Sequence, residues 1–132
     1  MRLLIDPRQT AIDLVVKNGI GAEIGVHIGD FSSVILNMAK PKKLYLIDPW
    51  KYFSESTYKD SMYGGDRVTQ KDMDGRYERV LKRFSAEISM GKVEVCRELS
   101  YEAAQHIKDG ELDFVYIDGD HSYKGVAQDL RA

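Results

Sequence analysis

Cysteine is nearly absent from the sequence, since Cys96 is the only one among 132 residues. A single cysteine excludes an internal disulfide bond and a cysteine metal cluster, and it fits a protein of a reducing compartment. An excess of one charge is missing too, because 19 basic residues stand against 21 acidic ones. The near balance gives no indication of nucleic acid or an anionic membrane surface as a partner.

Long apolar runs are missing as well. No stretch approaches the length that crosses a membrane, and the amino terminus lacks the basic and apolar segments of a secretion signal. Repeats, low-complexity tracts and linkers are also absent. We therefore predict one cytoplasmic domain over residues 1–132, which is long enough for a single core and too short for two.

Short apolar runs alternate with helical patterns along the chain. The runs have the length of strands and cover residues 22–26, 44–47, 93–96 and 114–117. The helical patterns cover residues 6–19, 31–39, 74–88, 100–108 and 122–132, with Ser100 and Ser122 as predicted caps of the last two. This alternation predicts an α/β fold, in which helices cover both faces of a parallel sheet.

In such sheets ligands bind beyond the carboxyl ends of the strands, so the residues after each run are the candidates for a site. The stretch EIGVHIGDFSS follows the first run and places glycines at positions 25 and 29. A helix that starts there offers free N–H groups to a ligand, although glycines can also serve only to make the turn. The spacing is not the G-x-G-x-x-G of NAD-binding proteins.

An acidic residue follows the second run. Asp48 lies roughly twenty residues beyond the glycine turn, where a carboxylate can accept hydrogen bonds from ribose hydroxyls. An aspartate that opens a loop before Pro49 is the alternative. After the third run, residues 98–100 could border an adenine ring, but Ser100 is explained equally well as a helix cap.

The fourth run ends in YIDGDHSY, which brings Asp118, Asp120 and His121 close together. Neighbouring carboxylates repel each other unless a cation or hydrogen-bond donors balance them. Carboxylate oxygens suit Mg²⁺, and an adjacent imidazole suits proton abstraction near neutral pH. A solvated acidic loop is the alternative to such a site.

The stretch IDGDHSYKGVAQDL contains the element IDxxHxYxxVxxDL, and through it the chain resembles a short bacterial group of class I S-adenosylmethionine-dependent methyltransferases. The glycine turn EIGVHIGDFS, the strand end LIDPW and the helix QKDMDGRYERVLKRF are similar to this group as well. The resemblance covers essentially the whole chain. It implies a Rossmann-like, doubly wound sheet with the strand order 3-2-1-4.

The resemblance also implies roles for individual residues. Asp118 would lie beside the reacting end of S-adenosylmethionine, and in metal-dependent members it would also bind the metal, here Mg²⁺. His121 would deprotonate the acceptor, a small-molecule hydroxyl, so that the catalytic pair is Asp118 and His121. His27 stands where the group often has glycine. The implied cofactor contacts are Glu23, Gly25, Gly29, Ser32, Asp48, Pro49, Trp50, Ser100 and Asp118.

Enzymes of this group continue through three further strands, whereas this sequence ends at Ala132. We therefore expect a truncated domain that lacks strands 5 to 7 and part of the acceptor pocket. A non-catalytic fragment that only binds the cofactor is the main alternative. The fourth strand would become an exposed edge, which predicts self-association, most simply as a homodimer.

Other α/β functions fit less well. A phospho-receiver domain would need an acidic pair after the first strand and an aspartate after the third, where the chain has His27 and Arg97. An NAD-dependent oxidoreductase would need the glycine spacing that is missing here. Residues 50–66 contain three tyrosines and a glycine pair, and they form either a lid on the substrate side or a plain surface loop.

Overall fold

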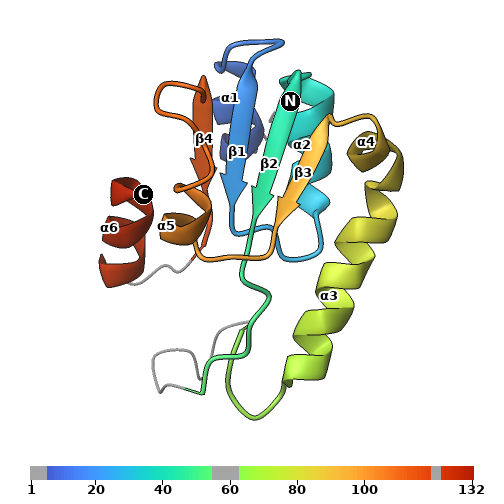
Figure 1. Ribbon diagram of the computed structural model, residues 1–132, viewed down its shortest axis with the longest axis vertical. Coiled ribbons are helices and arrows are strands. Elements are labelled where there is room, and N and C mark those ends of the chain that lie inside the picture. The colour runs from blue at the N-terminus through green and yellow to red at the C-terminus, as the bar shows by residue number, and fades with distance from the viewer. Residues whose placement is uncertain (1–5, 55–62, 120–122) are drawn as a thin grey trace, which may run out of the picture.

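The computed structural model describes residues 6–54, 63–119 and 123–132. Four strands form one sheet, in which every pairing is parallel and the order is β3-β2-β1-β4 (Figure 1). The strands are β1 (Ile20–Ile24), β2 (Lys43–Ile47), β3 (Val93–Cys96) and β4 (Phe114–Ile117). The predicted α/β class and the strand order implied by the resemblance are confirmed.

Helices fill the connections between the strands. Figure 1 shows α1 and α2 behind the sheet, α3 along its β3 side and α6 beyond β4. The helices are α1 (Pro7–Asp13), α2 (Asp30–Met38), α3 (Gln70–Arg83), α4 (Ser85–Ser89), α5 (Ser100–Ala103) and α6 (Tyr123–Arg131). In the described parts of the chain, no helix has the length and apolarity needed to cross a membrane.

Two cores lie on opposite faces of the sheet, and β2 contributes to both. Leu44 and Leu46 belong to the larger core, which also contains buried residues of α1, α2 and α3. Tyr45 and Ile47 point to the other face and pack with Ala103 of α5 in the smaller core. Because side chains alternate along a strand, a strand covered on both faces needs successive apolar side chains, as residues 44–47 of β2 provide.

Several helix ends differ from those predicted. The first helix ends at Asp13 and not at Gly19. A helix that continued through Asn18 is excluded by the left-handed φ of 60° at that residue. The helical pattern begins at residue 74, whereas α3 begins at Gln70, like the helix quoted for the resemblance, because Thr69 and Asp72 form a capping box. A break at Phe84 then separates α3 from α4.

The sheet has β4 at one edge, since β4 pairs with β1 and with no other strand of the described residues. Val115, at the centre of β4, is 46% exposed. Unpaired N–H and C=O groups beside apolar side chains favour the addition of another strand. The predicted homodimer is not tested by this arrangement and stays a prediction.

Replacing Val115 with lysine should reduce self-association, because a charged side chain on an edge strand disfavours pairing with a second strand. Light scattering over a concentration series would show a rising mass for the wild type and a monomer mass for Val115→Lys. Leu130→Lys, which adds the same charge to an exposed position of α6, is the control and should still associate. A wild type that stays monomeric at every concentration would contradict the prediction.

Candidate functional site

The carboxyl ends of β1 and β4 are held in close contact by Gly25. This glycine has a φ of 90°, and a Cβ atom on it would lie 2.1 Å from the main-chain oxygen of Asp118. The N–H group of Asp118 donates to the carbonyl of Ile24 at 2.7 Å, so the two strand ends are also joined by a hydrogen bond. Two predicted site residues, Gly25 and Asp118, therefore lie side by side.

The glycine turn continues from Gly25 to the start of α2. Gly29 precedes α2 and has a φ of 84°, and a Cβ atom there would lie 2.6 Å from the ring of Phe84. His27, between the glycines, has a φ of 58°, a left-handed conformation that favours glycine. The related methyltransferases often have glycine at this position, which agrees with the left-handed backbone of His27.

Asp48, at the end of β2, anchors this turn. It is 1% exposed, and its Oδ2 atom accepts hydrogen bonds from the N–H groups of Val26 at 2.9 Å and His27 at 3.0 Å. Its Oδ1 atom accepts from the N–H of Trp50 at 2.8 Å. One carboxylate thus fixes the backbone after β1 and the backbone after β2.

Tyr63 is a further hydrogen-bond donor to Asp48, and the sequence analysis did not predict this contact. The Tyr63 hydroxyl donates to Oδ2 at 2.6 Å. Burial, and then the nearby Asp48 carboxylate, raise the pKa of Tyr63, so the hydroxyl keeps its proton and remains a donor. A ribose hydroxyl could bond to this oxygen only by replacing one of the donors already present.

Glu23 and Ser32 lie beneath the turn and bond to each other. Glu23 is 1% exposed, Ser32 is fully buried, and the serine hydroxyl donates to the Glu23 carboxyl group. Burial raises the pKa of Glu23 to about 8, a change that the Ser32 hydrogen bond opposes and that Asp118 and Asp48 reinforce. The pair joins β1 to α2, and its predicted contact with a cofactor is not tested by this geometry.

Trp50 stabilises the glycine turn. Its side chain is fully buried, its Nε1–H donates to the carbonyl of His27 at 2.8 Å, and its ring packs against Tyr77 at 5.3 Å between centroids. Pro49, before it, is half-buried. Both residues lie where the resemblance puts the ribose side of the site.

At the end of β3, Ser100 is not the helix cap that the sequence predicted. It is the first residue of α5, and its hydroxyl donates to Asp129 of α6 at 2.6 Å. The N–H of Leu99 is satisfied instead by the Glu102 carboxylate at 2.9 Å. Nearby, the Oε2 atom of Glu98 is buried and has no hydrogen-bond partner among the described residues.

The proposed catalytic pair is only partly described. Asp118 follows β4, whereas Asp120 and His121 lie outside the described residues. Within the described ranges, no three histidine, cysteine or acidic residues form a group that could hold a metal ion. The Mg²⁺ expectation therefore has no support from this part of the chain.

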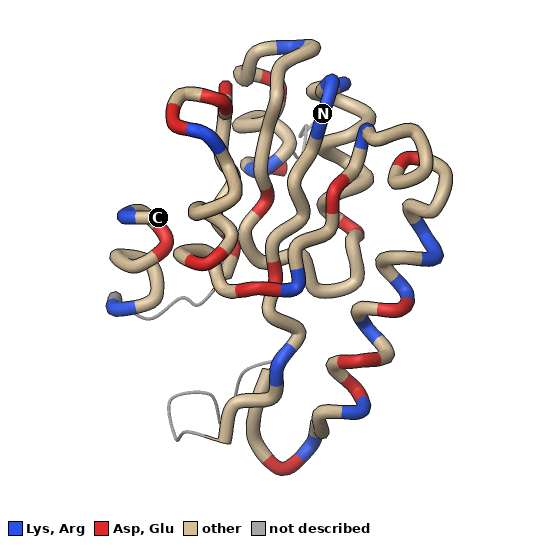
Figure 2. The backbone as a smooth tube through the Cα atoms, viewed as in Figure 1, with Lys and Arg blue, Asp and Glu red and all other residues tan. Residues whose placement is uncertain are grey.

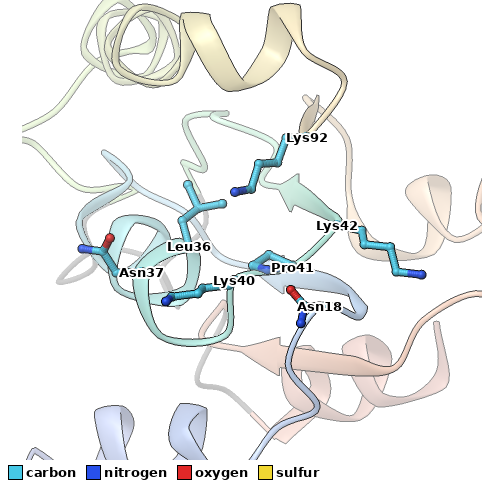
Figure 3. A pocket seen from close by; sticks show the side chains of 7 residues that line it. All are labelled: Asn18, Leu36, Asn37, Lys40, Pro41, Lys42 and Lys92. Carbon is cyan, nitrogen blue, oxygen red and sulfur yellow. The ribbon is translucent and has the colours of Figure 1, made fainter.

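Figure 2 shows acidic residues at the carboxyl ends of the strands and mixed charge along α3. An open hollow lies at the opposite end of the sheet (Figure 3). Lys42 and Lys92, which directly precede β2 and β3, are part of its lining, and none of the predicted site residues is. The hollow is therefore separate from the candidate site.

A family model described as a methyltransferase domain matches residues 22–132. The chain belongs to this family. The match confirms the resemblance to class I S-adenosylmethionine-dependent methyltransferases and implies S-adenosylmethionine as the methyl donor. No curated protein matches the chain.

The site of this methyltransferase domain has groups that suit such a donor. The buried Oε2 of Glu98, which has no partner in the described part of the chain, can accept a hydrogen bond from an amino group, and the Asp48 carboxylate can accept one from a hydroxyl. Asp48 and Asp118 lie close enough to Glu23 to raise its pKa. The residues present therefore fit a ligand with hydroxyl and amino donors and a positive charge.

Substituting Gly25 by alanine should destabilise the domain by about 2–4 kcal/mol, since the new Cβ would overlap the Asp118 backbone and the φ angle is unfavourable. Gly75→Ala is the matched control. That glycine lies in α3 with nothing within 4 Å of the new Cβ, so alanine should stabilise the domain by about 1 kcal/mol. Urea denaturation measures both, and equal midpoints for the two variants would contradict the close approach of β1 and β4.

Glu23→Gln should change how stability depends on pH. The pKa of Glu23 is about 8 when folded and 4.5 in the reference state, so the folded chain holds a proton that the unfolded chain has lost. Stability from this group is full below pH 4.5 and is lost as the pH rises toward 8. Relative to the variant, the wild type should lose up to about 1.4 kcal/mol per pH unit in this window. Denaturation curves at several pH values measure the difference, and a constant difference would show that Glu23 is ionised when folded.

Proposed function

We propose that the chain binds S-adenosylmethionine at the carboxyl ends of the strands and directs its methyl group to the hydroxyl of a small molecule. The observation that carries the proposal is the placement of the Asp48 and Asp118 carboxylates around the glycine turn. Carboxylates attract a sulfonium cation, whereas they repel the diphosphate of NAD. The charge of the site and the glycine spacing favour the same cofactor.

Three strand ends would hold the cofactor. The turn from Gly25 to Gly29 borders its methionine side, Asp48 its ribose and Glu98 its adenine. Bound there, the cofactor supplies a methyl group that is electrophilic because it is attached to a positively charged sulfur. The protein's own contribution is then to position the acceptor and to remove its proton.

Removal of that proton is assigned to His121. A neutral hydroxyl is a poor nucleophile, and an imidazole accepts a proton readily near neutral pH. When the acceptor oxygen takes the methyl group and the methyl–sulfur bond breaks to leave neutral S-adenosylhomocysteine, the hydroxyl proton would pass to a ring nitrogen of His121. Asp118, three residues earlier in the sequence, lies beside Gly25 and would face the cofactor.

Isothermal titration calorimetry tests the proposal. S-adenosylmethionine and S-adenosylhomocysteine should bind and NAD should not. Asp48→Asn should weaken S-adenosylhomocysteine by about 1.5–3 kcal/mol, since a charge-assisted acceptor is lost. Asp109→Asn is the control. Asp109 is an exposed acidic residue in a loop, so this variant should bind S-adenosylhomocysteine like the wild type.

Tighter binding of NAD than of S-adenosylhomocysteine would overturn the assignment. An unchanged affinity in a folded Asp48→Asn variant would remove Asp48 from the ligand contacts. Binding of the cofactor without methyl transfer to phenolic or sugar hydroxyls would identify the chain as a binding fragment.

A further inference from the structure

The four donors to the Asp48 carboxylate differ in how easily they could be replaced. Three are main-chain N–H groups, those of Val26, His27 and Trp50, and their positions are set by the turn and by the end of β2. The fourth is the side-chain hydroxyl of Tyr63. A side chain can rotate away while the backbone stays in place, so Tyr63 is the donor that a ligand can replace without unfolding the turn.

The surroundings of Tyr63 agree with this. Its backbone is held independently of its side chain, because the N–H of Phe53 donates to its carbonyl at 2.8 Å. Its ring meets His27 edge-on at 6.5 Å between centroids, and the Arg76 guanidinium lies 5.9 Å from the ring centre. Such ring contacts are weak compared with the charge-assisted hydrogen bonds that ribose hydroxyls can form with a carboxylate.

The hydroxyl of Tyr63 also has the donor role that a ribose hydroxyl would have in this position. Both are neutral O–H donors, and a carboxylate oxygen forms short hydrogen bonds with such groups. The observed distance of 2.6 Å is typical of a charge-assisted O–H···O⁻ bond. The Tyr63–Asp48 hydrogen bond is thus of the same kind as the bond that Asp48 would form with a ribose hydroxyl.

We propose that Tyr63 occupies the place of a ribose hydroxyl on Asp48 and is displaced when the cofactor binds. This inference rests on the proposed function, because it requires the cofactor's ribose to bond to Asp48. Tyr63 then acts as a specificity-determining residue: a ligand must bring a hydroxyl of its own to make up for the bond that it breaks. A ligand without ribose hydroxyls leaves the Tyr63–Asp48 bond intact and gains nothing from Asp48.

Calorimetry with Tyr63→Phe tests the inference. The variant lacks the competing hydroxyl, while two main-chain donors still hold the Oδ2 atom of Asp48, so it should fold and should bind S-adenosylhomocysteine about 10-fold more tightly. Tyr52→Phe is the matched control. The Tyr52 hydroxyl donates to the Gly65 carbonyl at 3.0 Å in the same segment, and its loss should leave the affinity unchanged.

A second ligand separates competition from a merely structural role. The 2′,3′-dideoxy analogue of S-adenosylhomocysteine should bind Tyr63→Phe and the wild type equally. An equal gain for both ligands would overturn the inference, because the ribose hydroxyls would then not be what replaces Tyr63. Unchanged or weaker binding of S-adenosylhomocysteine to Tyr63→Phe would also overturn it. If the folded wild type and both variants fail to bind S-adenosylhomocysteine, the proposed function itself falls.

Discussion

The structure depends on one buried carboxylate, that of Asp48. It accepts hydrogen bonds from the turn after β1, from the start of the segment after β2 and from Tyr63. Removal of this group would leave buried main-chain N–H donors unsatisfied, at a cost of about 1–3 kcal/mol for each. The same atom that holds the scaffold together is the one assigned to the ligand, so stability and binding at this site are coupled.

Trp50 connects the loop after β2 to α3 and to the segment after β3. Its carbonyl accepts hydrogen bonds from Gln70 of α3 at 3.1 Å and from Arg97 after β3 at 3.2 Å. Its backbone has a φ of 40°, an unfavourable value for a residue with a side chain. The bonds at its N–H, carbonyl and indole offset that strain, and they fix the position of the loop relative to α3 and β3.

The sequence predicted the strands well and the helix ends poorly. The bounds of β3 and β4 agree with their apolar runs, whereas β1 begins two residues before its run and β2 begins one residue before its run. The hydrophobic pattern reveals neither the end of α1 at Asp13 nor the left-handed backbone angle at Asn18. In the site, Asp48 could be found from its place after a strand, whereas its bond to Tyr63 spans 15 residues of sequence and required the folded chain.

The position of β1 has a consequence for how the chain folds during synthesis. β1 lies between β2 and β4, and its pairing with β4 joins segments about 93 residues apart, as the bond between Ile20 and Asp113 shows. While a ribosome makes the chain, one edge of β1 stays open long after β2 and β3 have been made. Contacts of such long range slow folding, and the nascent sheet is exposed to wrong partners until β4 emerges.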